Sequence, residues 1–426
     1  MNFLNADFSP IRVALFSGNY NCIMDGPARA LNRLVAFLEA HGVEVHVFSP
    51  TVAEPAFRAT GKVVSVPSIP VPWRSEYRLA LGLPRAIRRQ IEDFNPTLFH
   101  LSAPDWLGHA ALRLANRMNR PAVASYHTRF DFYARYYGGF WIERPMTRAM
   151  MRFYNRCDLV LAPCRSMADE LVAQGLRAPL SLWGRGVDAD VFHPDKRDLD
   201  WRRSLGFDDE DVVISFVGRL VIEKGIYRFA TVIDGLCQRL DRPVRCLVVG
   251  DGPSRDSFAR RLPGARFTGH LSGEDLARAY ASSDIFFNPS DSETFGNVTL
   301  EAMASGLPTL GVDAAGSRSL ITHGVTGFLG PVDDTGQLVT LLAQMVADPG
   351  LRRAMGVRAR QEAYRYRWSE ILGEVLDNYG RVIERRYAVR PLLLRPARPA
   401  VPTAAAPAFD LPLRAPTSVE SRKAAL

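Results

Sequence analysis

The feature that most constrains this chain is an alternation of short apolar segments with amphipathic ones. It begins with the apolar segment IRVALFSG at residues 11–18, which is followed by a loop and by the amphipathic segment GPARALNRLVAFLEAHG that ends at Gly42. A second apolar segment, VEVHVFSP, occupies residues 43–50. This order is typical of a β-α-β unit, in which parallel strands are covered by helices on both faces. The pattern therefore predicts an α/β fold.

The same order continues through the first half of the chain. We expect further strands at residues 97–103, 121–127 and 159–164. Each of these apolar segments ends in a polar loop. Open α/β sheets bind ligands at the carboxyl ends of their strands, so these loops are candidates for a binding site.

The pattern begins again after a polar and charged segment at residues 189–211. The expected strands of this second half are residues 212–220, 245–252, 265–271, 284–290 and 308–314. A chain of 426 residues is too long for one ordinary hydrophobic core. We therefore predict two α/β domains of similar plan that face a central cleft.

Composition and pattern together suggest where the domains begin and end. The predicted units are an N-terminal domain at residues 1–188, a C-terminal domain at 189–366, a helix at 367–388 that packs back on the N-terminal domain, and a tail at 389–426. The hinge is expected near residues 183–188, WGRGVD. The tail is rich in Pro, Ala and Arg and has no periodicity, so we expect it to be disordered.

Apolar run length, cysteine spacing and net charge each limit where this protein can work and what it can bind. No apolar run reaches the length of a membrane-spanning helix, and the first residues lack the features of a signal peptide, which predicts a cytoplasmic protein. The five cysteines form no CxxC pair and no zinc-like spacing, so we expect them to be reduced and mostly buried. The net charge of +8 favours an anionic partner: a phosphate-bearing substrate, an anionic lipid surface or nucleic acid.

Two cations follow the first strand of the second half. In the segment GRLVIEKG, Arg219 and Lys224 are five positions apart in a loop that begins and ends with glycine. Two cations at the carboxyl end of a strand suit a diphosphate better than a monoanion. The alternative interpretation is an ordinary solvated basic loop.

Two carboxylates occur in the segment SDSETFGNVTLEAMASG at residues 290–306. Seven residues separate Glu293 from Glu301, and Gly296 allows a tight turn into a helix that begins near Asn297. The first N–H groups of that helix would carry the positive end of its dipole. Each carboxylate can accept hydrogen bonds from neighbouring hydroxyls, which suits a sugar and a ribose, whereas the alternative is two exposed surface carboxylates.

These segments together resemble a known family. The combination of GRLVIEKG, GDGPSRDSF and the segment 290–306 continuing into GLPTL is similar to the family 4 retaining glycosyltransferases, whose fold, GT-B, consists of two Rossmann-like doubly wound domains facing a central cleft. The segments DGPARAL, SYHTRFDFYARYYG and WGRGVDADVF resemble the branch that contains GDP-mannose-dependent α-mannosyltransferases and sulfoquinovosyl-diacylglycerol synthases. The resemblance extends from about residue 11 to residue 385.

The resemblance implies roles for individual residues. Arg219 and Lys224 match the basic pair that neutralises the donor diphosphate. Glu301 matches the residue that holds the ribose, and Glu293 matches the residue that faces the transferred sugar. Gly26 matches the glycine of the first loop, and His127 matches the histidine beside the sugar. The N–H groups of Phe295, Gly296 and Asn297 match those before the helix. The backbone of Gly269 to Leu271 matches the stretch that contacts the base.

Three further residues, Asp25, His100 and Arg185, are candidate acceptor or sugar contacts. Asp25 stands where many members of the family have a glycine, and it either makes the loop less open or contacts acceptor or sugar hydroxyls. Arg185 stands where asparagine is common and would add a cation near the donor. His100, at the end of a predicted strand, either contacts the acceptor or is a hydrogen-bonded structural residue, and we favour the structural role.

The resemblance also implies a mechanism. The leaving diphosphate gains negative charge as the anomeric carbon becomes cation-like, so fixed cations near the diphosphate stabilise the transition state. The donor substrate is a nucleotide diphosphate sugar, and neither a metal nor another cofactor is required. The DAD sequence at 188–190 resembles a metal-binding motif, but its place in the linker favours a turn or a helix cap.

The acceptor is expected to bind the N-terminal domain. Residues 133–156 mix aromatic side chains with arginine, which suits either an anionic membrane surface or an ordinary helix with solvated arginines. A protein bound peripherally at the inner face of the membrane would fit the first of these. Nucleic acid is the weaker interpretation, because no nucleic-acid-binding motif accompanies the charge.

The expected function is transfer, with retention, of a hexosyl or hexuronosyl group from a nucleotide diphosphate sugar, preferably GDP-mannose, to a membrane lipid or glycan. The alternative is a UDP-sugar-dependent glycolipid synthase of the sulfoquinovosyl or glucuronosyl type. A sugar-nucleotide epimerase and a catalytically silent nucleotide-binding protein represent other classes. A nicotinamide-dependent oxidoreductase is disfavoured, because SGNYNCIMDG lacks the GxGxxG motif after the first strand.

Overall fold

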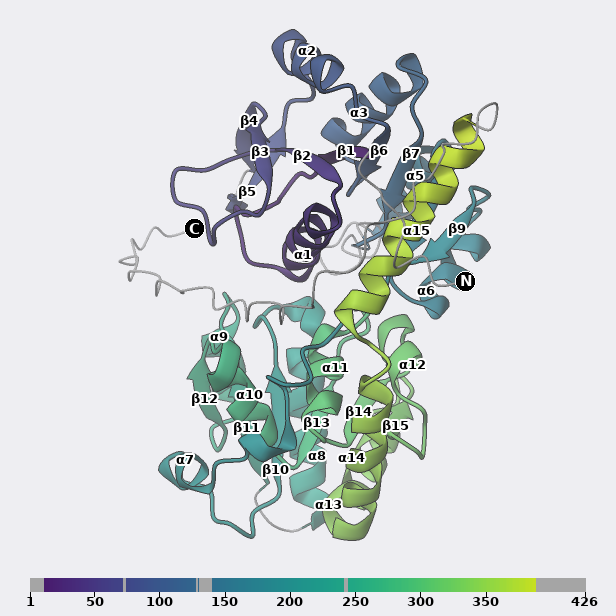
Figure 1. The fold of residues 1–426 in the computed structure, drawn as a ribbon. Helices are drawn as coiled ribbons and strands as arrows, with labels where there is room; N and C mark the ends of the chain where they lie inside the picture. Colours follow the sequence, from purple (N-terminus) through teal and green to yellow (C-terminus); the bar gives the residue numbers. More distant parts are fainter. Residues whose placement is uncertain (1–10, 72–73, 128, 130–139, 241–243, 388–426) are drawn as a thin grey trace, which may run out of the picture.

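The computed structural model describes residues 11–71, 74–127, 129, 140–240 and 244–387. These residues form two α/β domains, with the N-terminal domain in the upper half of Figure 1 and the C-terminal domain in the lower half. The last helix, α15 (Trp368–Tyr387), returns from the C-terminal domain and runs across the N-terminal one. The large sheet of each domain is parallel, so the predicted α/β class is confirmed.

The N-terminal domain is built on a seven-stranded sheet with the order β3-β2-β1-β6-β7-β8-β9. Its strands are β1 (Arg12–Phe16), β2 (Glu44–Ser49), β3 (Lys62–Ser65), β6 (Leu98–Leu101), β7 (Ala122–Ser125), β8 (Leu159–Ala162) and β9 (Leu180–Leu182). A separate antiparallel pair consists of β4 (Ser68–Val71) and β5 (Arg74–Ala80). The helices are α1 (Gly26–Ala40), α2 (Arg85–Phe94), α3 (Trp106–Arg117), α5 (Phe140–Tyr154) and α6 (Arg165–Ala173).

The sheet is buried on both faces, as its apolar strands require. Val13 and Leu15 of β1 pack with α1 and α15 on one face, whereas Ala14 and Phe16 belong to the cluster formed with α2, α3, α5 and α6 on the other. Successive side chains of a strand point to opposite faces, so both clusters need apolar residues from the same strand. This explains why β1 appears in the sequence as a continuous apolar run.

The C-terminal domain repeats this plan with a six-stranded sheet in the order β12-β11-β10-β13-β14-β15. Its strands are β10 (Val213–Val217), β11 (Arg245–Val249), β12 (Arg266–Gly269), β13 (Ile285–Asn288), β14 (Thr309–Val312) and β15 (Gly327–Gly330). The longer helices are α8 (Ile226–Leu240), α10 (Gly273–Ala281), α11 (Asn297–Ala304), α13 (Thr335–Ala347) and α14 (Pro349–Ala363). The shorter ones are η1 (Pro194–Lys196), α7 (Leu199–Ser204), η2 (Ile222–Lys224), α9 (Arg255–Arg261) and α12 (Ala315–Leu320).

All the strands predicted from the sequence are present, with ends that differ by at most three residues. The sequence did not reveal β3, β4, β5, β9 and β15. The first four are short or partly exposed, and β15 has a glycine at each end, so none forms a continuous apolar run. The polar segment 189–211 contains η1 and α7, which contact the C-terminal domain through α10 and the residues before β13.

The chain crosses between the domains at two places that lie side by side. The N–H of Val187 donates to the carbonyl of Tyr366, at 2.9 Å. A Cβ atom on Gly186 would lie 2.5 Å from the ring of Trp368, the first residue of α15. The predicted hinge segment at 183–188 therefore packs directly against the returning chain.

Several smaller expectations can be compared with the structure. All five cysteines are free, and four of them are buried, as predicted. None of the helices in the described residues combines the length and apolar character needed to cross a bilayer. The predicted tail at 389–426 lies outside the described residues.

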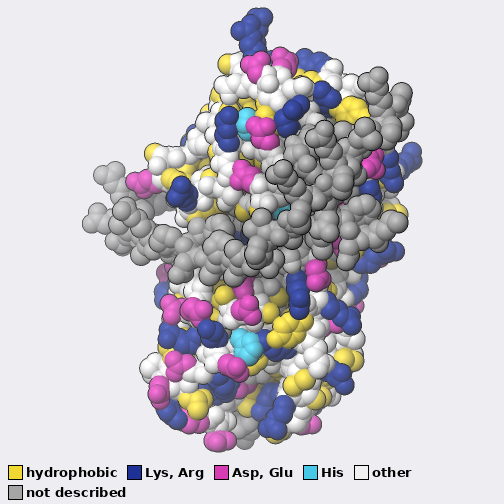
Figure 2. All heavy atoms as spheres, viewed as in Figure 1, with side chains coloured by type: hydrophobic (Ala, Val, Ile, Leu, Met, Phe, Trp, Pro, Cys, Tyr) yellow, Lys and Arg dark blue, Asp and Glu magenta, His cyan; other side chains and the backbone are white. Residues whose placement is uncertain are grey.

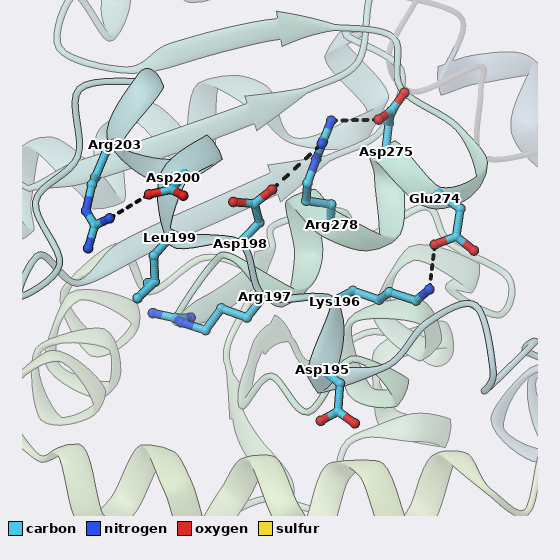
Figure 3. Close-up of a pocket in the computed structure, with 10 residues that line it drawn as sticks. All are labelled: Asp195, Lys196, Arg197, Asp198, Leu199, Asp200, Arg203, Glu274, Asp275 and Arg278. Carbon is cyan, nitrogen blue, oxygen red and sulfur yellow. Dashed lines mark hydrogen bonds and ion pairs between the residues drawn. The ribbon is translucent and has the colours of Figure 1, made fainter.

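The surface of the C-terminal domain carries charges of both signs. Figure 2 shows dark blue and magenta side chains interspersed over the lower half of the molecule. A polar hollow of 620 Å³ lies between η1, α7 and α10. In Figure 3, each pair joined by a dashed line is a cation facing a carboxylate. Lys196 contacts Glu274 at 2.7 Å, and Arg203 contacts Asp200 at 2.6 Å. These cations are already neutralised, so the hollow is a poor site for an anionic ligand.

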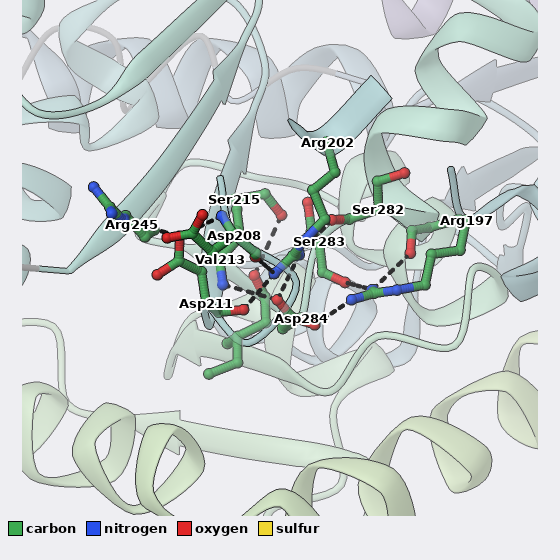
Figure 4. Close-up of polar contacts among 12 residues, drawn as sticks. Arg197, Arg202, Asp208, Asp211, Val213, Ser215, Arg245, Ser282, Ser283 and Asp284 are labelled. Carbon is green, nitrogen blue, oxygen red and sulfur yellow. Dashed lines mark hydrogen bonds and ion pairs between the residues drawn. The ribbon is translucent and has the colours of Figure 1, made fainter. Parts of the chain in front are cut away.

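A buried arginine holds the first strand of the C-terminal domain in place (Figure 4). The guanidinium of Arg202, on α7, donates to Asp284 Oδ2 at 2.8 Å and to the carbonyl of Ser282 at 2.9 Å. Asp284 also accepts from the N–H of Val213 at 2.8 Å and from Arg197 at 2.9 Å. The Arg202 side chain is 1% exposed, so Asp284 is the counter-charge of a fully buried cation.

Substitution of Asp284 by Ala is therefore expected to destabilise the C-terminal domain by about 3–5 kcal/mol, because it leaves a buried charge without its partner. Urea denaturation followed by circular dichroism measures this loss. Asp200→Ala is the matched control, since the Asp200 carboxylate is 92% exposed in its pair with Arg203 and its loss should cost less than about 1 kcal/mol. Equal shifts in the two variants would contradict this account of Arg202.

Candidate active site

The candidate residues converge where the two domains meet. The loops after β7 and β8 in the N-terminal domain contact the loop after β13 in the C-terminal domain, and the start of α1, which follows the loop after β1, approaches the start of α11. All of these loops follow the carboxyl ends of parallel strands. This is the place at which open α/β sheets bind ligands.

The loop of residues 290–296 is held by both domains. The hydroxyls of Ser290 and Ser292 donate to the carbonyl of Glu223, at 3.1 and 2.8 Å. On the other side, the hydroxyl of Thr294 donates to the carbonyl of His127 at 3.0 Å, and the thiol of Cys164 donates to the carbonyl of Thr294 at 3.2 Å. The position of this loop therefore depends on both domains.

The loop places Glu293 against one of the predicted cations. Lys224 Nζ donates to Glu293 Oε1 at 2.6 Å, and the two side chains are 30% and 18% exposed. Gly225, which follows Lys224, has a φ of +72°, and a Cβ atom there would lie 2.5 Å from the carbonyl oxygen of Pro289. Glycine is needed at this position for both reasons, and it brings η2 close to the end of β13.

The second predicted cation, Arg219, is exposed at the end of β10. Its guanidinium donates to the hydroxyl of Tyr77 across the domain interface, at 3.4 Å. Its charge also lowers the pKa of Asp25, although burial, the largest influence, raises that pKa. Arg219 therefore faces the loop after β1.

The start of α11 lies opposite the start of α1. Gly296, with a φ of +99°, precedes α11, and no side chain caps this helix. A Cβ atom on Gly26 would lie 3.3 Å from Nδ2 of Asn297, so the two helix starts approach closely. In the described part of the chain, the N–H groups of Gly296 and Asn297 have no hydrogen-bond acceptor. The side chain of Phe295 is buried, so only its backbone can face a ligand.

Glu301 lies one turn into α11 and is half-buried. It accepts a hydrogen bond from the hydroxyl of Tyr280 at 3.1 Å. Burial raises the pKa of Glu301, whereas the charges of Arg29 and Arg33 and the Tyr280 hydroxyl lower it. Neither arginine was predicted from the sequence, although their spacing of four residues on the amphipathic helix α1 places them on one face.

The predicted base contact lies beside these loops. Gly269 ends β12, and its carbonyl accepts from the N–H of Gly250 at 2.8 Å. Gly250 has a φ of +137°, and a Cβ atom there would collide with the carbonyl of Gly218. The loops after β10, β11 and β12 are therefore adjacent, while Leu271 is half-buried against the apolar cluster.

Asp25 has a structural role in this arrangement. Its carboxylate accepts from the N–H of Ala28 at 2.8 Å and from Asn19 Nδ2 at 3.2 Å, so it caps α1. The DAD sequence is likewise a turn, because Asp188 Oδ1 accepts from the N–H groups of Asp190 and Val191. The described ranges contain no group of three or more His, Cys, Asp or Glu side chains that could hold a metal ion.

A chain of buried hydrogen bonds leads away from His127. Arg185 Nη2 lies 2.6 Å from His127 Nδ1, and His127 Nε2 lies 2.8 Å from Ser125 Oγ. Ser125 Oγ is 3.0 Å from His100 Nε2, and His100 Nδ1 is 2.5 Å from the hydroxyl of Tyr379 on α15. A guanidinium can only donate, so His127 Nδ1 must accept and its proton must lie on Nε2. His127 therefore donates to Ser125, and the Ser125 hydroxyl is positioned to donate to His100 Nε2, which leaves His100 Nδ1 to donate to Tyr379.

These hydrogen bonds correct two of the predictions. His100 is fully buried with both ring nitrogens occupied, so an acceptor contact is wrong and the structural role is confirmed. Arg185 is 4% exposed and also donates to the carbonyls of Trp183 and Gly184, so its guanidinium is directed into the protein and does not contact an acceptor or a sugar. Burial lowers the pKa of Arg185 to about 10.

Both histidines are neutral in this environment. Burial lowers the pKa of His100 to about 3. The pKa of His127 is also well below its ordinary value, because of burial first, then the charge of Arg185, then His100. The His127 side chain is therefore uncharged. The backbone carbonyl of His127 accepts a hydrogen bond from Thr294, which lies in the loop that carries Glu293.

The fold and the site together define a class of protein. Two parallel α/β domains that bring cations, carboxylates and a helix start to their junction are typical of enzymes that use nucleotide sugars. The family model described as "Glycosyltransferase Family 4" matches residues 24–191, and that described as "Glycosyl transferases group 1" matches residues 198–362. The chain belongs to glycosyltransferase family 4, and it is a glycosyltransferase with the GT-B fold.

Individual relatives agree with this assignment. The chain is 33% identical to sulfoquinovosyl transferase SQD2 of Arabidopsis thaliana, over 84% of this chain and 71% of that protein. It is 32% identical to a GDP-mannose-dependent alpha-mannosyltransferase of Corynebacterium glutamicum, over 88% of this chain and 90% of that protein. Among solved structures, sucrose-phosphate synthase from Thermosynechococcus elongatus matches 89% of this chain and all of its own, with a TM-score of 0.73 and 18% identity.

Removal of the Arg185 guanidinium should change the protonation of His127. In Arg185→Met, Nδ1 of His127 loses its donor and the nearby positive charge disappears, so the pKa of His127 should rise and the preference for the Nε2 proton should weaken. Imidazole ¹⁵N NMR distinguishes the two tautomers and follows the titration. Arg165→Met, at an arginine that is 82% exposed, should leave the His127 signals unchanged. An Nδ1-protonated His127 in the unaltered protein would contradict the proposed direction of the chain.

The buried His100 should also make stability depend on pH. Above its ordinary pKa of 6.5, His100 is neutral in both folded and unfolded protein and contributes no pH dependence. Below pH 6.5 only the unfolded state binds the proton, until the folded pKa of about 3 is reached, so stability should fall with pH. In His100→Gln the dependence should be shallower by up to about 1.4 kcal/mol per pH unit, measured by urea denaturation between pH 7.5 and 4.5. Parallel curves for the two proteins would show that His100 titrates normally.

Proposed function

We propose that this enzyme is a retaining α-glycosyltransferase that moves a mannosyl group from GDP-mannose to a membrane lipid or a growing glycan. Three GDP-mannose-dependent alpha-mannosyltransferases support this donor, because they are 32–34% identical to the chain over 90–99% of their own length. The acceptor class is supported by lipid-related relatives, which include an alpha-monoglucosyldiacylglycerol synthase of Streptococcus pneumoniae at 24% identity.

The observation that carries the proposal is the convergence of Lys224 and Glu293, at 2.6 Å, next to the start of α11. The same loop is bonded to His127 through Thr294. A diphosphate can be held between the cations and the helix start, with the sugar on the side of Glu293 and His127. In this arrangement the ribose would lie near Glu301.

The chemistry follows from charge. As the bond from the anomeric carbon to the diphosphate breaks, negative charge grows on the leaving oxygens, and Lys224, Arg219 and the first N–H groups of α11 are suited to stabilise it. Charges that are already in place need little rearrangement during the reaction. The leaving phosphate oxygen then accepts the proton of the attacking hydroxyl on the same face of the sugar, which retains the configuration. The proposal requires no metal ion, since fixed cations supply the charge.

A UDP-sugar-dependent glycolipid synthase is the second candidate. The similarity to sulfoquinovosyl transferase SQD2 favours it, at 33% identity over 368 residues. Both candidates use the same cations and the same helix start. They differ in the base and in the sugar that Glu293 would contact.

We also propose that the enzyme works at a membrane surface in the cytoplasm, bound peripherally. The predicted membrane segment at residues 133–156 is described only from residue 140 onward, where α5 begins. Trp141 and Ile142 on this helix are exposed, at 72% and 36%. Exposed aromatic and aliphatic side chains beside arginine suit the interface of a bilayer.

The transfer reaction tests the proposal directly. Glu293→Gln and Lys224→Ala should each reduce transfer of labelled mannose from GDP-mannose to a lipid extract by at least about a hundredfold, because each removes a charge from the proposed reaction centre. The protein should remain folded, as judged by circular dichroism. The Lys196–Glu274 pair in the hollow of Figure 3 offers matched controls: Lys196→Ala and Glu274→Gln should transfer normally.

The same assay separates the candidate functions. Transfer from UDP-sugars and not from GDP-mannose would favour the glycolipid synthase, and interconversion of sugar nucleotides would indicate an epimerase. Binding without any product would indicate a silent nucleotide-binding protein. NMR of the product reports whether the α configuration is retained, and activity in the presence of EDTA is expected because no metal is required.

A further inference from the structure

A groove of 680 Å³ lies on the N-terminal domain away from the proposed donor site. It is formed by the loop between β5 and α2, by α2, by one side of α3 and by the residue that follows α5 by two positions. Its charged lining consists of four arginines: Arg88, Arg113, Arg117 and Arg156. The proposed function makes no use of these residues.

The charge of the groove is of one sign. Its lining contains no Asp or Glu, and in the described part of the chain none of the four arginines forms an ion pair. The positive field reaches His109, whose pKa is lowered by burial first and then by Arg113 and Arg156. In contrast, the cations in the hollow of Figure 3 face carboxylates. The groove therefore has unneutralised charge available for an anion.

The groove continues into a row of arginines along α5. Arg144, Arg148 and Arg152 are exposed on α5 and four residues apart, so each lies beside the next on the helix surface, and the exposed Arg156 follows in the turn after α5. The opposite face is buried through Met150, Met151 and Phe153. The row consists of Arg144, Arg148, Arg152 and Arg156. Because Arg156 belongs to both features, the groove and the row form one surface, which we call the arginine surface.

The arginine surface also exposes large apolar groups. Trp106 is 60% exposed and Leu81 is 52% exposed within the groove, while Trp141 is 72% exposed near the start of α5. A small inorganic anion would use the arginines but would not need these side chains. Tryptophan and arginine together are suited to the headgroup region of a bilayer, where one side of the residue contacts phosphate and the other contacts acyl chains.

We propose that the arginine surface binds the phosphate headgroups of anionic phospholipids, and that the groove between α2 and α3 is the principal headgroup site. This inference rests on the proposed function only in placing the enzyme at a membrane. Binding there would hold the N-terminal domain on the bilayer while the donor binds elsewhere. Asp105, which caps α3 beside Trp106, also lies close to the loop before α1, because a Cβ atom on Gly18 would lie 2.5 Å from its carboxylate.

Vesicle sedimentation tests this proposal with the full-length protein. Vesicles of phosphatidylcholine containing 30% phosphatidylglycerol should bind the protein in about 0.1 M NaCl, whereas pure phosphatidylcholine vesicles should bind it much more weakly. Replacement of Arg113, Arg117 and Arg156 by Gln should weaken binding to the anionic vesicles by about a hundredfold, since each basic residue near such a surface contributes about fivefold. Trp106→Ser should weaken the part of the binding that persists at high salt.

The matched control removes the same charge from the other domain. Arg239, Arg353 and Arg358 are exposed on α8 and α14, and their replacement by Gln should change vesicle binding less than about threefold. Equal losses in the two triple variants would overturn the proposal, because only net charge would then matter. Equal binding to neutral and anionic vesicles would also overturn it. Unchanged melting temperatures show that the substitutions at these exposed positions do not unfold the protein.

Transfer activity distinguishes this inference from the proposed function. With an acceptor dissolved in detergent, the Arg113, Arg117 and Arg156 triple variant should transfer sugar normally, because none of its substitutions lies in the proposed donor site. With the acceptor in anionic vesicles, the same variant should transfer more slowly. Normal rates in both formats would overturn the headgroup site without affecting the proposed transferase activity, while absence of transfer by the unaltered protein would contradict only the latter.

Discussion

The hydrogen bond from Thr294 to the carbonyl of His127, at 3.0 Å, is the contact on which the arrangement of the site depends. It joins the loop before α11 in one domain to the end of β7 in the other. Cys164 binds the carbonyl of the same threonine, and two serines tie the loop to η2. Glu293 and Lys224 are brought together by these contacts and not by their positions in the sequence, which are 69 residues apart.

The helix α15 extends this dependence to the end of the described chain. It leaves the C-terminal domain, packs on α1 and β1, and places Tyr379 at the end of the hydrogen-bond chain that begins at Arg185. An arginine that is buried without a carboxylate partner is costly, and here it is satisfied by two carbonyls and by the ring of His127. The buried guanidinium keeps His127 neutral and in one tautomer beside the loop that carries Glu293.

The sequence predicted most of the fold because both sheets are buried on two faces. Such strands must be continuous apolar runs, which are easily recognised, whereas the edge strands β3 and β9 are partly exposed and have no such run. The candidate site was also largely predictable. Arg219, Lys224, Glu293 and Gly296 occur in two short segments whose spacing suggests a phosphate-binding loop and a helix start, and the structure places these segments together.

Other residues were interpreted less well, and the reason is their distance along the chain. His100 and Tyr379 are 279 positions apart, so nothing in the sequence indicates that the Tyr379 hydroxyl forms a hydrogen bond with the His100 ring. Arg185 was expected to be a cation near the donor, but its environment, which decides whether a guanidinium is buried or exposed, is formed by both domains. Arg29 and Arg33 carry a visible helical spacing, yet only the packing of α1 across the interface reveals Glu301 as the carboxylate that they face.

The sequence by itself determined the α/β class, the division into two similar domains, the family and the short segments that carry charge. These properties depend on local patterns of apolar, glycine and charged residues, which can be recognised without knowing any contact. Only the tertiary structure decided the tautomer of His127, the burial of His100 and Arg185, the pairing of Lys224 with Glu293, and the continuity of the arginine surface. Each of these depends on side chains brought together from distant segments, and the protonation and exposure of a group are properties of its neighbours in space.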